Sequence, residues 1–466
     1  MDSHQSPFID EARIAQTLQA AAAGPLDPQR LKDVLAKALE LKGLDASDVA
    51  VLSQVSSPDQ AAELFAAASR VKDSIYGSRL VLFAPLYVSN LCANECQYCA
   101  FRANNAELKR RVLSQSEVAA EVKTLVEQGH KRVLLVAGES YPRRGFDYVL
   151  DCITTVYATR LGKGEIRRVN VNVAPLEIEQ FKRLKEARIG TYQLFQETYH
   201  RETYARVHLA GKKVDYDWRV TVMDRAMEAG IDDVGIGVLF GLADWRFELQ
   251  GLLQHIRHLE QAFGCGPHTI SVPRIEPAVG SPMAFAPPSQ VSDDDFKRIV
   301  AILRLAVPYT GLILSTRENA ETRRACFALG VSQISAGSRT NPGGYQEQQD
   351  DVAAQFCLGD HREIDEVVRD VASMGYLPSF CTACYRLGRT GADFMELAKP
   401  GEIKYHCDPN ALSTFQEYLA DYATPQTREI GEALIAKTLE KMDAKQREVS
   451  TKLLEKVKAG RRDVCC

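Results

Sequence analysis

Residues 80–99 read LVLFAPLYVSNLCANECQYC, an apolar run that is followed at once by three cysteines. The apolar part predicts a buried strand, and similar β-rich runs recur along the chain between longer amphipathic segments. The predicted strands are 80–86, 132–136, 169–173, 191–195, 233–239, 269–272, 312–315 and 331–335, and the clearest helices are 116–127, 176–186, 218–229, 245–262, 293–307 and 320–328. Eight strands that alternate with helices predict an α/β fold of the (β/α)8 TIM-barrel type. A doubly wound sheet stays open, because strand closure cannot be counted from sequence.

The flanking regions have a different pattern. Residues 10–76 have apolar side chains near helical spacing, broken at Gly24-Pro25 and Ser57-Pro58, which predicts an N-terminal helical segment. After 373 the strand-helix alternation ends in a stretch rich in Cys, Gly and Arg, followed by helical segments. We therefore predict three units: a helical segment at 1–78, the barrel at 79–375 and a mainly helical C-terminal domain at 376–466.

Composition excludes several classes of protein. Of 466 residues, 45% are hydrophobic and 25% are charged, which is typical of a folded globular chain. The formal net charge of -4 provides no basic field for nucleic acid or an anionic membrane. The N-terminus lacks the pattern of an export signal, and no apolar run approaches the length of a membrane span. We therefore expect a soluble protein in the cytoplasm or another reducing compartment, where clustered cysteines more often bind metal than form disulfides.

The first cysteine cluster is Cys92, Cys96 and Cys99, with Cx3Cx2C spacing directly after the first predicted strand. Three thiolates on one short loop can each bind one iron of a 4Fe-4S cluster and leave the fourth iron open to a second molecule. A structural zinc site needs a fourth ligand, and this loop offers none.

This motif resembles that of the radical S-adenosylmethionine (SAM) enzymes, in which SAM chelates the open iron. The resemblance implies reductive cleavage of SAM to a 5′-deoxyadenosyl radical. Tyr98 matches the aromatic residue that packs by the adenine, and Gly138-Glu139 resembles the GGE stretch that meets the methionine amino group, with Ala137 in place of its first glycine. The bland alternative for the glycine is a simple turn.

Four residues on or beyond later predicted strands are further cofactor candidates. Glu197 and Arg219 resemble the family's contacts to ribose and to the methionine carboxylate, for which a carboxylate and a guanidinium are suited. A plain salt bridge is the alternative. Gly235 and Gly237 would let the cofactor lie against backbone, but a lone GxG pattern equally suits packing.

The second cluster is Cys381, Cys384 and Cys407, with Cx2Cx22C spacing. It predicts a second three-cysteine iron-sulfur site. From the residues alone, a zinc site with His406 as the fourth ligand stays open.

A radical SAM barrel with this second triplet resembles the family of FeFe-hydrogenase maturases of the HydG type, which are radical tyrosine lyases. The resemblance covers nearly the whole chain and implies a second 4Fe-4S cluster that carries an additional iron, bridged by a free L-cysteine molecule. It also implies that His268 binds this iron. Without the resemblance, a lone histidine beside a strand is more often structural.

Arg317, Ser335 and Ser338 follow the last two predicted strands and resemble residues that hold the substrate carboxylate in aromatic amino acid lyases. The sequence does not decide between the serines, which could also be capping residues. The implied reaction needs an external one-electron donor. The radical takes hydrogen from the amino group of L-tyrosine, the Cα–Cβ bond breaks to p-cresol and dehydroglycine, and the fragment becomes CO and cyanide in an Fe(CO)2(CN) unit.

Other hydrogenase maturation proteins, which assemble the H-cluster, are the implied partners. The nearest alternative is the thiamine-pathway tyrosine lyase ThiH, a 2-iminoacetate synthase, and a non-catalytic iron-sulfur scaffold is a more remote one. Two clusters at opposite ends of a barrel predict a continuous internal cavity between them. The isolated cysteines 152, 265, 326 and 357 are expected to be free thiols, and Cys465-Cys466 is expected to be a flexible end.

Overall fold

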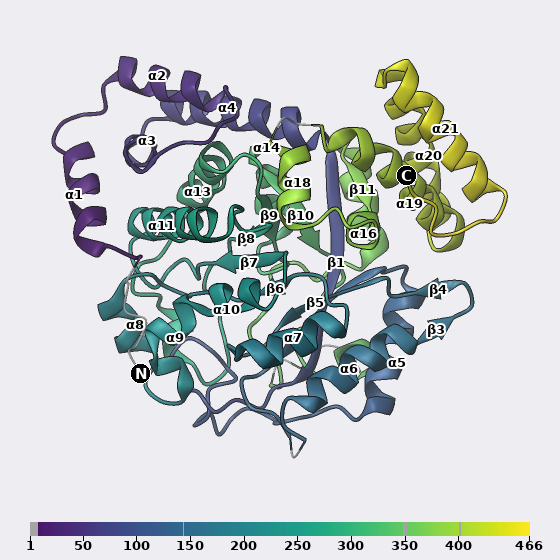
Figure 1. Ribbon diagram of the computed structural model, residues 1–466, viewed down its shortest axis with the longest axis horizontal. Helices are drawn as coiled ribbons and strands as arrows, with labels where there is room; N and C mark the ends of the chain where they lie inside the picture. Colours follow the sequence, from purple (N-terminus) through teal and green to yellow (C-terminus); the bar gives the residue numbers. More distant parts are fainter. Residues whose placement is uncertain (1–7, 143, 348–349, 351, 400–401) are drawn as a thin grey trace.

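A computed structural model describes residues 8–142, 144–347, 350, 352–399 and 402–466 (Figure 1). Its centre is a parallel sheet that closes on itself, because Val81–Phe83 of the first strand pair with Gln333–Ser335 of the last. The barrel strands are β1 (Arg79–Ser89), β2 (Arg132–Ala137), β5 (Arg168–Asn172), β6 (Tyr192–Gln193), β7 (Val234–Gly237), β8 (Thr269–Ser271), β9 (Gly311–Leu314) and β10 (Val331–Ser335). The closure confirms the predicted barrel and excludes the doubly wound sheet.

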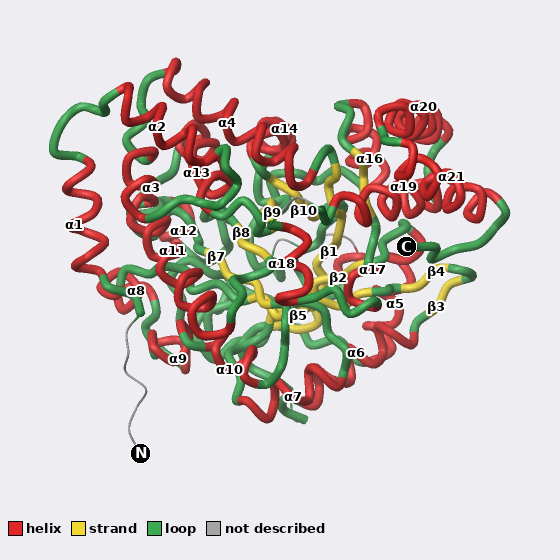
Figure 2. Tube along the Cα trace, turned by 45° about the horizontal axis from the view of Figure 1, so that its top comes forward, coloured by secondary structure: helices red, strands yellow, loops and turns green. Residues whose placement is uncertain are grey.

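Helices surround this barrel (Figure 2). They are α5 (Gln115–Glu127), α6 (Asp147–Ala158), α7 (Ile178–Glu186), α8 (Arg201–Val207), α9 (Tyr216–Val220), α10 (Val222–Glu228), α11 (Trp245–Phe263), α12 (Pro282–Phe285), α13 (Asp293–Ala306), α14 (Ala320–Leu329) and α15 (Gly344–Glu347). The helix expected at 218–229 is divided at Thr221, where the guanidinium of Arg225 bonds to the carbonyl oxygens of Thr221 and Trp218. Helix α6 was not among the predicted helices, because its β-branched residues favour strands and burial decides its conformation. A short hairpin, β3 (Arg160–Leu161) and β4 (Gly164–Glu165), follows it.

The N-terminal segment forms α1 (Glu11–Ala21), α2 (Pro28–Ala38), α3 (Ala46–Leu52) and α4 (Pro58–Tyr76). Side-chain caps fix the starts of these helices, and Ser57 forms a capping box at α4. Helix α4 packs on α13 and α14, while α1 and α3 pack on α11. The buried side chains of these helices belong to the same hydrophobic core as those of the barrel. The limits of the three predicted units stay predictions.

The C-terminal part is joined to the bottom of the barrel. After α16 (Ile364–Ser373), β11 (Leu377–Ser379) pairs with Arg79–Val81 at the start of β1, on the edge where β2 pairs from Ala84 onward. The chain continues through α17 (Ala383–Arg386), α18 (Gly391–Ala398), α19 (Lys404–Asp421), α20 (Pro425–Lys441) and α21 (Ala444–Lys458). The first cysteine loop follows the end of β1 and the second lies beside its start. Strand β1 rises over its length by roughly 30 Å.

The cysteine-ended tail is not loose, so the expected flexible end is wrong. The Ser413 hydroxyl donates to the carbonyl oxygen of Val464 at 2.8 Å, and the backbone N–H of Cys466 donates to Asn410 Oδ1 at 2.8 Å. Arg389, from the second cysteine loop, donates to the carbonyl oxygen of Cys466 at 2.8 Å. These contacts, which could not be foreseen from the local sequence, fix the tail against α19. Across the described ranges, no helix is both long and apolar enough for a membrane span.

Candidate active site

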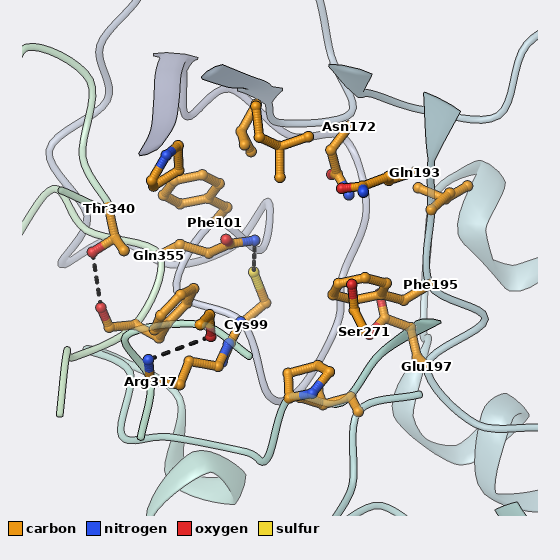
Figure 3. Close-up of a pocket in the computed structure, with 18 of the residues that line it drawn as sticks. Cys99, Phe101, Asn172, Gln193, Phe195, Glu197, Ser271, Arg317, Thr340 and Gln355 are labelled. Atoms are coloured by element: carbon orange, nitrogen blue, oxygen red, sulfur yellow. Dashed lines mark hydrogen bonds between the residues drawn. The ribbon is translucent and has the colours of Figure 1, made fainter. Parts of the chain in front are cut away.

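A cavity of about 180 Å³ opens at the carboxyl ends of the barrel strands. Figure 3 shows Arg317, Thr340 and Gln355 on one side of it and Phe195 and Glu197 on the opposite side. The sequence-predicted residues that line this upper cavity are Cys92, Cys96, Tyr98, Cys99, Gly138, Glu139, Glu197, Arg219, Arg317 and Ser335. Segments far apart in sequence thus meet in one site because the strands are parallel and end on the same face.

The three cysteines of the first loop present their thiols to the cavity. Burial raises the pKa of Cys92 and Cys96, and it raises the pKa of Cys99 to about 11. The Gln355 amide lies 3.8 Å from Cys99 Sγ. Within the described part of the chain, no group of three or more His, Cys, Asp or Glu side chains has the arrangement of a single-ion metal site. Three thiols without a fourth side-chain ligand, on a loop open to a cavity, fit a 4Fe-4S cluster with an open iron better than zinc.

Buried charges form the wall opposite Arg317. Arg219 pairs with Glu139 at 2.9 Å and with Glu197 at 3.3 Å, and Lys213 pairs with Glu197 at 2.6 Å. Burial by itself raises the pKa of Glu139, but attraction by Arg219 and Lys213, with a hydrogen bond from Asn94, outweighs it and holds the pKa below its ordinary value. The wall therefore keeps ionised groups that can meet a polar ligand.

Sequence reasoning missed Lys213, which lies on the 3-10 helix Lys212–Val214. Its side chain is 8% exposed, and its ammonium lies 5.6 Å from the centre of the Tyr98 ring. A lysine next to another lysine has no local signal of burial. Glu197 itself has φ 74°, a left-handed conformation that is uncommon outside glycine and recurs at functional sites.

The predicted glycines divide into two kinds. A Cβ on Gly138 would lie 2.1 Å from the carbonyl oxygen of Leu91, so glycine is needed where the turn after β2 touches the cysteine loop. Gly235 and Gly237 lie on β7 and are not among the lining residues. A Cβ on Gly235 would meet Thr269 and Gln193, which indicates packing inside the barrel.

At the other side of the cavity, Arg317 and Ser335 come from the ends of β9 and β10. The guanidinium carbon of Arg317 lies 3.3 Å from the centre of the Phe356 ring, and burial lowers its pKa. Ser335 Oγ accepts a hydrogen bond from the backbone of Thr316 at 3.0 Å. Ser338 is buried but does not line the cavity. Of the two serines, only Ser335 therefore has the position that a substrate contact requires. Phe356, a loop residue, had no sequence signal.

A second, lower cavity of about 70 Å³ lies at the opposite end of the barrel. Cys381, Cys384, Cys407 and His268 all line it, as the sequence predicted, whereas His406 does not. A hydrogen bond from the Cys384 thiol holds the pKa of Cys407 below its ordinary value. Burial lowers the pKa of His268, which favours the neutral imidazole that metals bind. Three thiols and one histidine on a shared cavity fit the predicted second iron site, while the zinc site with His406 has no support.

The upper and lower cavities have separate linings, and the predicted continuous cavity between them stays a prediction. Phe83 and Ser335 line the upper cavity, and Val81 and Gln333, two residues earlier on the same strands, line the lower one. The Gln193 amide, which lines the upper cavity, donates to Thr269 Oγ1 at 3.3 Å. Polar side chains thus lie in the barrel interior below the upper cavity's cysteine loop.

Comparison with known proteins agrees with this geometry. The radical SAM superfamily matches residues 86–248, and the biotin and thiamin synthesis associated domain matches residues 271–377. The 2-iminoacetate synthase of Escherichia coli (strain K12) is 32% identical over 343 residues, which are 73% of this chain and 88% of that protein. A crystal structure of HydG, a maturase of the FeFe-hydrogenase, superposes with a TM-score of 0.95 at 48% identity and covers 99% of this chain and 100% of its own. The structure of the FeFe-hydrogenase maturase HydG from Carboxydothermus hydrogenoformans superposes with a TM-score of 0.83 at 40% identity. It covers 95% of this chain and 98% of its own.

Proposed function

Because this chain belongs to the radical SAM family that contains the FeFe-hydrogenase maturase HydG, we propose that it is a maturase of this kind. It cleaves the Cα–Cβ bond of L-tyrosine to p-cresol and dehydroglycine and converts the fragment to CO and cyanide. The product is an Fe(CO)2(CN) unit for the H-cluster, delivered to other maturation proteins. The observation that carries the proposal is the pair of cysteine triplets, each on its own cavity, at opposite ends of one barrel.

The upper cavity has the residues for the shared first step. Cys92, Cys96 and Cys99 would hold a 4Fe-4S cluster, and this cluster, reduced by an external one-electron donor, supplies the electron that splits SAM. The chain's own part is to orient SAM and to exclude water. The paired carboxylates Glu139 and Glu197 accept from the SAM ammonium and ribose hydroxyls, since ionised carboxylates accept strongly.

Arg219 and Tyr98 complete the proposed SAM site. Arg219 is 3% exposed at its side chain and holds both carboxylates, so it fixes the geometry in which they meet the cofactor. The Tyr98 hydroxyl forms a hydrogen bond of 2.8 Å with His208 Nε2, and this bond fixes the tyrosine ring beside the adenine position. Gly138 keeps the adjoining turn close to the cysteine loop.

On the far side, Arg317 binds the tyrosine carboxylate, and Ser335 adds a hydroxyl donor. A guanidinium suits a carboxylate because it offers two parallel N–H groups. Half-buried Arg317 has no carboxylate within 4.0 Å among the described residues, so its charge is available to a ligand.

The lower cavity would hold the second cluster. Cys381, Cys384 and Cys407 would bind a 4Fe-4S cluster, and His268 would bind the additional iron that a free L-cysteine molecule bridges to it. Arg132 donates to the carbonyl oxygen of Cys381 at 2.8 Å and so holds this loop at the barrel's end. Transfer of the fragment would lead through the barrel interior, where the Gln193 amide donates to Thr269 Oγ1.

The thiamine-pathway lyase is the alternative, and 32% identity to 2-iminoacetate synthase favours a shared first half-reaction. The HydG structure covers 99% of this chain, whereas that relative aligns with 73% of it. The lower cavity with its cysteine triplet gives this chain a second site that a lyase alone does not need.

The test is an anaerobic assay of the reconstituted protein with SAM, tyrosine and a reductant. We expect p-cresol, cyanide and CO from the wild type, and p-cresol without CO from Cys407→Ser. The matched variant Cys326→Ser, a buried thiol away from both cavities, should keep all three products. A wild type that makes p-cresol but no CO would support the thiamine-type lyase, and unchanged CO in Cys407→Ser would refute the second site.

A further inference from the structure

The charged side chains of the upper cavity are not all paired. Glu139 and Glu197 on one wall are neutralised by Arg219 and Lys213. The remaining charged carboxylate and guanidinium are Glu276 and Arg317, which follow the neighbouring strands β8 and β9 and line the same cavity. Across the described ranges, neither side chain forms an ion pair within 4.0 Å, with each other or with a third residue.

Glu276 and Arg317 nevertheless influence one another. The positive charge of Arg317 lowers the pKa of Glu276, and the carboxylate of Glu276 raises the pKa of Arg317, although burial is the larger influence on both. Two opposite charges that interact without touching leave room for a ligand between them. Both side chains are half-buried, and unpaired charges that are partly removed from water are costly unless a ligand compensates them.

We propose that Glu276 binds the ammonium group of the substrate amino acid while Arg317 binds its carboxylate. This inference rests on the proposed function and extends it to a residue that no motif indicated. In an α-amino acid the two charged groups are attached to one carbon, so a carboxylate and a guanidinium on adjacent strand ends match them. Charge-assisted hydrogen bonds of this kind are the strong ones.

Glu276 also has the basicity to take a proton from the ammonium. Burial and the neighbouring Glu318 raise the pKa of Glu276 to about 7, with Asp293 adding to the rise and Arg317 and Arg274 opposing it. In the transfer, one ammonium N–H bond breaks and one carboxyl O–H bond forms, which leaves a neutral amine. Both N–H bonds of that amine remain for hydrogen abstraction, and no oxidant is consumed. A base with a pKa near the working pH is the efficient one.

The binding test uses the reconstituted holoprotein with SAM and no reductant, so that no turnover occurs. Calorimetry compares L-tyrosine with 3-(4-hydroxyphenyl)propanoate, which lacks the ammonium, and with tyramine, which lacks the carboxylate. Glu276→Gln should weaken the binding of tyrosine and of tyramine by about 10- to 100-fold and leave the affinity for the propanoate unchanged. Arg317→Gln should weaken the binding of tyrosine and of the propanoate but not the binding of tyramine.

The matched control is Asp293→Asn, because Asp293 contacts Arg274 near Glu276 but does not line the cavity. It should leave all three affinities unchanged. A second readout is the pH profile of kcat/KM for tyrosine, measured by p-cresol formation. In the wild type, kcat/KM should rise through about pH 7, and in Glu276→Gln this rise should be absent.

The outcomes separate the two ideas. If wild type binds tyrosine but Glu276→Gln binds it equally well, or loses the propanoate as strongly as tyrosine, the role of Glu276 is refuted. If calorimetry with L-phenylalanine as a fourth ligand shows that Glu276→Gln removes the preference for tyrosine over phenylalanine, Glu276 faces the phenol and the assignment is also refuted. If wild type neither binds tyrosine nor forms p-cresol, the proposed function itself fails.

Discussion

Replacement of Arg219 by leucine tests the buried charge network of the upper cavity. Arg219 holds Glu139 at 2.9 Å and Glu197 at 3.3 Å and donates to the carbonyl oxygen of Phe195 at 2.7 Å. Leucine removes the positive charge but keeps apolar volume. Glu197 retains Lys213 at 2.6 Å, whereas Glu139 loses its main counter-charge.

The expected cost is that of one buried ion pair broken on one side, about 3–5 kcal/mol. At roughly 2.1 cal/mol/K of unfolding entropy per residue, a chain of 466 residues changes its free energy of unfolding by about 1 kcal/mol per degree near Tm. The thermal midpoint at neutral pH should therefore fall by roughly 3–5 °C.

The loss should depend on pH. In the wild type, the pKa of Glu139 is held below its ordinary value, so its contribution to stability is present above the unfolded pKa and is lost as pH falls through the folded pKa. In the variant, burial dominates and raises the pKa of Glu139. The loss of unfolding free energy is therefore largest at the higher pH, where the carboxylate of the wild type is ionised and paired. The difference between wild type and Arg219→Leu should be larger at pH 7.5 than at pH 5.

The assay is thermal unfolding at both pH values, with Arg225→Leu as the control. Arg225 is partly buried and bonds to carbonyl oxygens, including that of Leu176 at 2.9 Å, and the structure gives it no carboxylate ion pair in the ranges it describes. The fall in the thermal midpoint caused by Arg225→Leu should be the same at both pH values. An equal loss for Arg219→Leu at pH 5 and pH 7.5 would show that the network acts through packing and would refute the electrostatic reasoning.

Three other predictions concern the surroundings of the sites. Gly138→Ala should lower the rate of p-cresol formation by about 100-fold, because the new Cβ collides with the Leu91 carbonyl and displaces the cysteine loop; a rate near wild type would contradict this. Burial raises the pKa of Glu248 to about 8, so the folded state keeps a proton that the unfolded state releases, and stability falls as pH rises from about 5 to 8. Glu248→Gln should flatten that decline in urea unfolding, and an unchanged slope would oppose it. Arg386→Ala removes the contact with Asp463 at 2.7 Å that holds the tail, and it should weaken retention of iron at the second site by up to about 5-fold in iron analysis while p-cresol is unchanged.

Some features could be predicted from local sequence. The alternation of strands and helices follows from side-chain periodicity, which each segment carries by itself. The two cysteine triplets are short motifs whose spacing indicates their chemistry. Residues placed directly after strands, such as Glu139 and Arg317, could be assigned to one face because parallel strands end together.

Other features were decided by contacts between distant segments. The 3-10 helix that carries Lys213 is brought to the wall of Glu197 by packing, and nothing in its local pattern indicates burial. The barrel register places Ser335 in the cavity and leaves Ser338 outside it.

The same holds for the interior and the tail. Gln193 and Thr269 lie far apart in sequence, yet their side chains meet beside Gly235 in the barrel interior. The sequence by itself determined the alternation of strands and helices and the spacing of the two cysteine groups, because those depend on local periodicity, whereas closure of the barrel needed the pairing of β1 with β10. Only the tertiary structure decided which side chains share a cavity and which charges stay unpaired, because those depend on strand register and on the packing of residues that are distant in the chain.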